Sequence, residues 1–226
     1  MTDLARYEFS DGISAITLDD GKVNCFSPAM VASFNRALDQ ADKDGGVVLV
    51  SGRPGILSAG FDLREFEKGE AVGQALVRDG ALLAERLFAH PRPVVIACTG
   101  HAIAMGCFIL LAATVRIGVD GEFKIGANEV AIGMAVPRFA TELCRHRLAT
   151  AYQTRAITTA ELFSPAVAVD VGFLDRVVTA EALADEARKT AVGLAELSDA
   201  DYTETLTRLR KPTRELIRDR IATDYT

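Results

Sequence analysis

Residues 93–115 carry no Asp, Glu, Lys or Arg, and this stretch limits what the chain can fold into more than any other segment. About 20 apolar residues are enough for a helix to cross a bilayer. This stretch, however, opens with the β-branched run Val94–Ile96 and is interrupted by Thr99, Gly100 and Gly106. That pattern is typical of a buried strand, a turn and a buried helix. We therefore expect no membrane insertion and a well-packed core.

The same order of strand and helix continues along the chain. Asp11-Gly12 is a hairpin signal, Ser27-Pro28 is typical of a helix start, and Pro91 and Pro93 end a helix that begins near Glu70. The expected strands cover residues 7–10, 13–18, 47–50, 94–98, 115–119 and 123–125, and residues 51–58 form a polar loop. Expected helices begin near residues 28, 70, 104, 137, 164 and 179. This alternation predicts an α/β fold with a largely parallel sheet.

Composition narrows the function classes. The 226 residues have 49% hydrophobic content, enough for one domain with a small appendage. A formal charge of −6 with no basic stripe argues against nucleic-acid binding. The cysteines stand at 25, 98, 107 and 144 and the histidines at 90, 101 and 146, with no C-x-x-C or H-x-x-x-H pair. We therefore expect no disulfide framework and no metal site, and a cytoplasmic location.

Two glycine-containing turns follow two of the buried strands. They are Ser58–Leu63 and Thr99–Gly106. Helix N-termini present free N–H groups and a partial positive charge. Two such termini that converge would form an oxyanion hole, which is often the largest single term in catalysis. Turns of this kind are common, so the pattern alone leaves the function open.

Five segments together resemble the crotonase (enoyl-CoA hydratase/isomerase) family. The resemblance covers about residues 5–185 in the family's order, through Val23–Phe26, Ser58–Leu63, Thr99–Cys107, Ile125–Gly133 and Arg155–Val178. It implies a crotonase-like spiral of repeated ββα units over residues 1–180 and a C-terminal helical segment over 181–226 that packs at a subunit interface. It also implies a homotrimer or a dimer of trimers.

The resemblance places an oxyanion hole on the backbone N–H groups of Phe61 and Met105. The family usually has glycine at the positions of Ala104 and Met105. A residue with a side chain does not readily adopt a positive φ. We therefore expect either a slightly different turn at Met105 or a turn that does not need the glycines.

The family's hydratases use two glutamates, and only one is kept here. Glu129 matches the second, whereas Phe108 stands at the position of the first. The family's Δ3,Δ2-enoyl-CoA isomerases show this single-glutamate pattern. An aromatic ring at 108 would exclude water and raise the pKa of Glu129, which favours proton transfer over hydration. The alternatives are that Glu129 caps a helix or a loop and takes no part in chemistry, and that Phe108 is an ordinary core aromatic.

The matched segments also imply the substrate-binding residues. The stretch around residue 22 would line the CoA channel, and the two turns would border the thioester: Lys22, Val23, Asn24, Ala59, Gly60, Asp62, Leu63, Arg64, Gly106 and Phe108. Lys22 is equally consistent with a surface lysine. We expect the acyl tail between residues 66–83 and 132–140. The substrate is an acyl-CoA or enoyl-CoA thioester, with no cofactor beyond its CoA.

The C-terminal segment is dense in cations. It carries Arg208, Arg210, Lys211, Arg214, Arg218 and Arg220. The pattern favours a solvated helical face, and the alternatives are subunit packing or contact with a ligand phosphate.

Three functions stay open at this point. The first is an enoyl-CoA isomerase, in which Glu129 moves a proton along an enolate held by Phe61 and Met105. The second is an enoyl-CoA hydratase of low activity. The third, motivated by Met105 and Phe108, is a homologue that binds acyl-CoA without turnover. Thioester hydrolysis or decarboxylation would also suit the family, since a fold does not fix a function.

Overall fold

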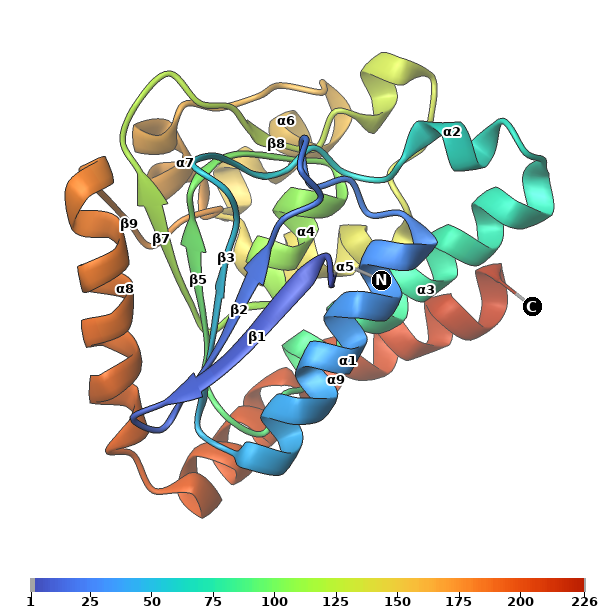
Figure 1. Cartoon of the computed structure of the whole chain (residues 1–226). Coiled ribbons are helices and arrows are strands. Elements are labelled where there is room, and N and C mark those ends of the chain that lie inside the picture. Colours follow the sequence, from blue (N-terminus) through green and yellow to red (C-terminus); the bar gives the residue numbers. More distant parts are fainter. Residues whose placement is uncertain (1–2, 226) are drawn as a thin grey trace.

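The computed structural model describes residues 3–225, so residues 1–2 and 226, at the outer ends of the two predicted segments, lie outside the described residues. Two sheets form within this range (Figure 1). The larger has the order β1 (Ala5–Ser10), β2 (Ile13–Leu18), β3 (Val47–Ser51), β5 (Val94–Cys98), β7 (Val115–Val119) and β9 (Arg176–Val178). The smaller has the order β4 (Gly55–Ser58), β6 (Gly100–Ile103) and β8 (Ile125–Gly126). The β1–β2 pair is antiparallel, and the other strand pairs are parallel.

The chain passes from the large sheet to the small sheet and then into a helix, three times in succession. These passages are β3–β4, β5–β6 and β7–β8, each followed by helical structure, which confirms the predicted spiral of ββα units. The helices are α1 (Pro28–Asp44), α2 (Leu63–Phe66), α3 (Glu70–Phe88), α4 (Met105–Ala112), the 3-10 helix η1 (Glu129–Ile132), α5 (Arg138–Arg147), α6 (Thr150–Thr158), α7 (Pro165–Val171), α8 (Ala180–Ala195) and α9 (Asp199–Asp224).

The local signals act as predicted at the hairpin and at the first helix. Asp11 and Gly12 both adopt positive φ, at 51° and 73°, in the two-residue turn between β1 and β2. Ser27 is the N-cap of α1, where its side chain accepts a hydrogen bond from the N–H of Met30, and Pro28 follows at the first helical position.

The small sheet corrects two predictions. Residues 51–58 were expected to be a loop, and residues 99–103 a turn, but they contain β4 and β6. The glycines that suggested turns serve close strand pairing instead: Gly55 is paired with Gly100, and a Cβ on Gly100 would lie 2.0 Å from the carbonyl carbon of Gly55. The short strand β9 and helix α6 were not predicted, and the strand expected at 123–125 is β8.

The large sheet is covered on both faces. On one face α8 lies along the strands, where Leu183, Ala187 and Ala191 pack with Val95 and Ile117 (Figure 1). On the other face α1 crosses β1 and β2, and the main core continues through α3 and α4. The uncharged stretch 93–115 therefore holds β5, β6 and α4, which lie inside the protein. Among residues 3–225, no helix combines the length and apolar character needed to span a bilayer.

Candidate active site

Three segments that carry predicted site residues leave the same edge of the small sheet. Phe61 follows β4, Met105 follows β6, and Glu129 follows β8. These strands are parallel neighbours with β6 in the middle, so their carboxyl ends lie together. Ligands of parallel α/β sheets bind outside the carboxyl ends of the strands. The topology thus places two backbone turns and one carboxylate around a common point.

The turn after β4 directs the N–H group of Phe61 away from the neighbouring segment around Phe26. Phe26 forms a parallel bridge to this turn, donating to the carbonyl of Gly60 at 2.8 Å and accepting from the N–H of Asp62 at 3.2 Å. Because peptide groups alternate along an extended segment, the N–H of Phe61 points to the opposite side. No hydrogen bond formed within residues 3–225 uses it.

The turn after β6 leaves a second free N–H group. Met105 is the first residue of α4, and the carbonyl of Ala104 accepts from Cys107 at 2.9 Å and from Phe108 at 3.2 Å. In the described part of the chain the N–H of Met105 has no acceptor, as expected for the first turn of a helix. The two turns touch, because a Cβ on Gly60 would lie 2.7 Å from the Cβ of Ala104 and 3.5 Å from the Met105 nitrogen.

The structure also shows where the missing glycines matter. Met105 has no positive φ, so its side chain costs the backbone nothing. Ala104 instead takes φ 51° and ψ −123°, which glycine adopts far more readily. The strain of this turn therefore falls on Ala104.

Glu129 carries a buried carboxyl group. The residue is 5% exposed, and its Oε2 atom accepts no hydrogen bond from residues 3–225. Burial raises its pKa to about 7, because the charged form loses contact with water. With burial, its charge also raises the pKa of the Cys107 and Cys144 thiols. At the N-cap of η1, the side chain of Asn128 forms no capping hydrogen bond.

A cavity of about 340 Å³ opens at Glu129, and we call it the Glu129 cavity. Besides Glu129, the predicted site residues that line it are Ala59, Phe61, Asp62, Leu63 and Arg64. Cys25, Ala104 and Asn128 also line it; each lies in a segment that carries the family resemblance, but none was predicted to be a site residue. The ranges expected to hold the acyl tail contribute Phe66, Val77, Ile132, Met134 and Pro137.

The remaining predicted site residues lie outside the wall of this cavity. Lys22 is exposed, and Val23 is 46% exposed. Asn24 is fully buried, with its side-chain amide donating to the carbonyls of Leu18 at 3.0 Å and Leu57 at 3.2 Å. Asn24 thus fixes the loop that precedes α1.

Gly106 and Phe108 support the turns from inside. A Cβ on Gly106 would lie 2.6 Å from the carbonyl oxygen of Ser58, so glycine here lets α4 approach the end of β4. Phe108 is fully buried and packs edge-on against Phe139, with ring centroids 6.1 Å apart. Burial raises the pKa of Glu129, as expected, but Phe108 lies in the core and is not among the residues that line the Glu129 cavity.

The side chains of Phe61 and Met105 meet at α3. A Cβ on Gly80 would lie 2.6 Å from the ring of Phe61 and 3.3 Å from Cε of Met105. The lack of a side chain on Gly80 therefore lets both turns rest on this helix. His101 does not line the Glu129 cavity. Its Nδ1 accepts from the N–H of Lys124, and its ring packs against Phe123.

The acidic neighbour of Glu129 in this cavity is already paired. Asp62 accepts from Arg64 at 2.9 and 2.7 Å, and these hydrogen bonds lower the pKa of Asp62. The Arg64 side chain is 73% exposed, so a cation stands at the cavity mouth. No group of three His, Cys, Asp or Glu side chains within residues 3–225 could hold a metal ion.

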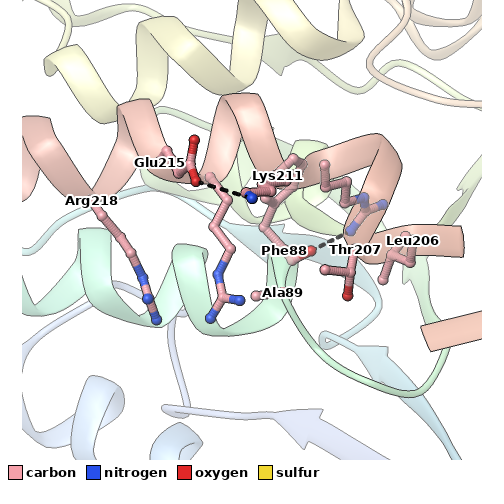
Figure 2. Close-up of a pocket in the computed structure, with 9 residues that line it drawn as sticks. Phe88, Ala89, Leu206, Thr207, Lys211, Glu215 and Arg218 are labelled. Atoms are coloured by element: carbon pink, nitrogen blue, oxygen red, sulfur yellow. Dashed lines mark hydrogen bonds and ion pairs between the residues drawn. The ribbon is translucent and has the colours of Figure 1, made fainter. Parts of the chain in front are cut away.

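A second cavity, of about 280 Å³, lies between α9 and the end of α3 (Figure 2). It is bordered by several of the C-terminal cations, which are mostly engaged with the protein itself. Arg210 is buried and donates to the carbonyls of Phe88, Ala112 and Ala113. Arg214 and Arg218 both donate to Glu85, at 2.6 and 2.9 Å. The prediction of a solvated face is therefore wrong for Arg210.

Comparison with known proteins gives consistent matches over nearly the whole chain. The family model described as enoyl-CoA hydratase/isomerase matches residues 8–224. The structure is similar to an enoyl-CoA hydratase/isomerase family protein from Pseudomonas syringae, with a TM-score of 0.97, 42% identity and coverage of 99% of this chain and 97% of that chain. It is also similar to an apo enoyl-CoA isomerase from Mycobacterium tuberculosis, with a TM-score of 0.94, 37% identity and coverage of 98% and 97%. In sequence, the mitochondrial enoyl-CoA delta isomerase 1 of Mus musculus is 29% identical over 225 residues, which are 97% of this chain and 78% of that protein.

Proposed function

Because the chain belongs to the enoyl-CoA hydratase/isomerase (crotonase) family of enzymes, we propose that it moves the double bond of a 3-enoyl-CoA to the 2-position. The observation that carries this proposal is that Glu129 is buried and that its Oε2 atom has no hydrogen-bond partner among the described residues. The other carboxylate lining the cavity, Asp62, is bound to Arg64. Hydration in this family needs two carboxylates around a water molecule, whereas a double-bond shift needs one group that removes a proton and returns it.

In the proposed mechanism the thioester oxygen lies between the N–H groups of Phe61 and Met105. Glu129 removes a proton from C2 of the substrate, and the electrons of the broken C–H bond form a double bond between C1 and C2 while the carbonyl electrons move onto the thioester oxygen. The two N–H groups, one of them at the N-terminus of α4, stabilise that negative charge. The same carboxylic acid then delivers its proton to C4, so that the double bond lies between C2 and C3. No electrons leave the substrate, so the reaction needs no cofactor beyond the substrate's CoA.

The pKa of Glu129 suits both halves of this transfer. A group that first takes and then returns a proton works best when its pKa lies near the working pH. Burial raises the pKa of Glu129 to about 7. We therefore expect kcat/KM to rise with pH through about 7 in the free enzyme, because the carboxylate is the active form. A pH profile measured under first-order conditions tests this expectation.

The decisive experiment compares three reactions of the same preparation. We expect 3-hexenoyl-CoA to be converted to 2-hexenoyl-CoA, the Glu129→Gln variant to lose this activity, and hydration of crotonyl-CoA to be much slower. Deuterium at C2 of the substrate should appear in part at C4, because one carboxylic acid carries it. Full activity in the Gln variant would sink the proposal. Hydration as fast as isomerisation would favour a hydratase, and acyl-CoA binding without any turnover would favour a binding protein.

The assembly into homotrimers or dimers of trimers stays a prediction. Apolar side chains on α9 support it, since Leu209 is 67% and Leu216 is 43% exposed in the single chain. Light scattering coupled to size-exclusion chromatography measures the mass directly, and a monomer would contradict the prediction.

A further inference from the structure

Ser58 ends β4, immediately before the turn that carries the N–H group of Phe61. It is fully buried, and its hydroxyl forms two hydrogen bonds. The O–H donates to the carbonyl of Asn24 at 2.6 Å, and the same oxygen accepts from the N–H of Gly60 at 3.1 Å. The hydroxyl therefore links the loop before α1 to this turn. Because Ser58 is not among the residues that line the Glu129 cavity, any effect on a substrate passes through the turn.

Gly60 depends on this hydrogen bond more than a residue with a side chain would. It is buried and has φ 97°, in a region that glycine adopts freely. The two peptide groups beside it can therefore rotate unless hydrogen bonds hold them. The bridge to Phe26 holds the peptide group after Gly60, and the Ser58 hydroxyl holds the one before it. The position of the Phe61 N–H depends on both.

The hydroxyl also decides which N–H group of the turn is left for a ligand. The N–H groups of Ala59 and Asp62 donate to backbone carbonyls at 3.0 and 3.2 Å. With Gly60 bound to Ser58, the N–H of Phe61 is the one between residues 59 and 62 that has no acceptor in the described part of the chain. Without the hydroxyl, the buried Gly60 N–H would lose its acceptor, which is costly, and the turn would shift to find another.

Ser58 touches the second turn as well. A Cβ on Gly106, the second residue of α4, would lie 2.6 Å from the carbonyl oxygen of Ser58 and 3.0 Å from its Cβ. The acceptor of the Ser58 hydroxyl is itself anchored, because the side-chain amide of Asn24 donates to two buried carbonyls. Ser58 therefore lies against both segments that carry the N–H groups of Phe61 and Met105, and an anchored partner fixes its orientation.

We propose that Ser58 is a positioning residue for the oxyanion hole: its hydroxyl holds the turn after β4 so that the N–H of Phe61 points to the same substrate oxygen as the N–H of Met105. The inference rests on the proposed function, since it assumes that the thioester oxygen lies between these two groups. Donors stabilise a developing charge only when they lie close to the place that the oxygen takes in the transition state. A displaced turn should therefore slow the reaction and leave binding of the unreacted thioester almost intact.

The Ser58→Ala variant tests the split between kcat and KM with 3-hexenoyl-CoA. We expect kcat to fall by about 10- to 100-fold, as for a misplaced donor, and KM to stay within about twofold. Ser33→Ala is the matched control, because Ser33 of α1 is similarly buried and its hydroxyl also accepts from a backbone N–H, that of Ala5 at 3.0 Å. Both variants free one buried N–H and should lower Tm to a similar extent, but Ser33→Ala should keep the wild-type kcat.

A second measurement removes proton transfer by Glu129. In the Glu129→Gln background, bound 3-oxobutanoyl-CoA loses its C2 proton to solvent and forms an enolate, which has a distinct ultraviolet absorbance. The oxyanion hole should lower the pKa of this bound ligand below that of the free ligand. Adding Ser58→Ala should raise that pKa by about one to two units, which corresponds to the same 10- to 100-fold effect. If Ser58→Ala does not fold, Ser58→Cys replaces it, because a thiol is a weaker donor and acceptor in the same place.

The outcomes separate this inference from the proposed function. A kcat of Ser58→Ala equal to that of Ser33→Ala, or a raised KM with an unchanged kcat, would overturn the role of Ser58. An enolate pKa that the Ser58 substitution leaves unchanged would also overturn it. If the wild type shifts no double bond while the enolate pKa still depends on Ser58, the isomerase function fails and the positioning role stands. If binding does not lower the pKa of the ligand at all, the oxyanion hole fails, and both proposals fail with it.

Discussion

Two buried glutamates, Glu129 and Glu85, have nearly the same exposure and opposite surroundings. Glu129 is 5% exposed and has an oxygen with no hydrogen bond among the described residues. Glu85, in α3, is 7% exposed and accepts hydrogen bonds from Arg214 and Arg218 of α9. Burying a carboxylate is costly unless it is paired. The protein meets this requirement at Glu85 and leaves it unmet at Glu129.

The contrast shows what each region contributes. At Glu85 the charge is neutralised and ties α9 to α3, so the residue serves the fold. At Glu129 burial disfavours the charged form and raises the pKa to about 7, which suits proton transfer. The neighbouring turn carries a second unmet cost, the positive φ of Ala104. Stability is thus given up at the strand ends and recovered elsewhere.

The largest effect is expected when the unpaired glutamate is neutralised. Glu129→Gln should lower kcat for 3-enoyl-CoA by about 10²- to 10⁴-fold, the range typical of a lost general acid–base. Its KM should change little, because an amide of the same shape keeps the cavity. Steady-state kinetics with a parallel thermal melt measure both quantities. A Glu129→Gln variant that stays active, or that unfolds as readily as a Glu85 variant, would contradict a catalytic role for Glu129 as opposed to a structural one.

The next effect is the part of the pH dependence of stability that comes from Glu129 and that the Glu129→Gln variant lacks. Its pKa rises from an ordinary 4.5 to about 7 in the folded chain, so the folded state binds this proton more tightly than the unfolded state does. The stabilisation is complete below pH 4.5 and is lost as the pH rises to 7, by about 3 kcal/mol in total. Glu129→Gln should therefore gain stability over the wild type between pH 4.5 and pH 8. Urea unfolding at both pH values measures it, and a parallel pH dependence in both proteins would contradict the assignment.

A smaller effect, of the opposite kind, is expected at the paired glutamate. Glu85→Ala leaves two guanidinium groups without their acceptor, but their side chains are 36% and 60% exposed and regain water. We expect a loss of about 2 kcal/mol in unfolding free energy, less than for a fully buried pair, with kcat within about twofold of the wild type. The matched control is Glu215→Ala, because Glu215 pairs loosely with Lys211 and both are 67% exposed. Equal midpoints for the two variants in urea would refute a structural role for Glu85.

The features predicted from sequence were those set by neighbouring residues. The Asp11-Gly12 turn and the Ser27-Pro28 helix start each depend on contacts within a few positions. The three positions at the strand ends, Phe61, Met105 and Glu129, follow from motifs that each occupy one short segment. Their meeting at one edge is then a consequence of parallel strands, which the alternation of strands and helices predicted.

The remaining features depend on distant contacts. Glu85 and its partners lie 129 and 133 positions apart, so the sequence could not distinguish a solvated cationic face from an anchoring one. The small sheet was missed because Gly55 and Gly100 carry the signal of a turn while their role is close pairing. Asn24 lies in a stretch that was expected to line the CoA channel, yet its side-chain amide donates both hydrogen bonds to buried backbone carbonyls. In each case, a partner that the local sequence does not name decides the outcome.

The smallest expected effect tests whether strain at the strand ends is separable from the chemistry. Ala104→Gly removes a side chain from a residue at φ 51° and ψ −123°, where relief of strain is worth about 1–3 kcal/mol. Greater freedom of glycine in the unfolded chain offsets about 0.4–1 kcal/mol of this gain, so the net stabilisation should be about 1 kcal/mol. Ala75→Gly is the matched control, because Ala75 lies inside α3 with the same intermediate burial as Ala104 and should lose about 1 kcal/mol. Opposite shifts of Tm in the two variants are the expected result. If Ala104→Gly is instead destabilising, the methyl group of Ala104, which lies next to Gly60, holds the two turns together. The backbone strain at Ala104 would then result from a contact that the site needs.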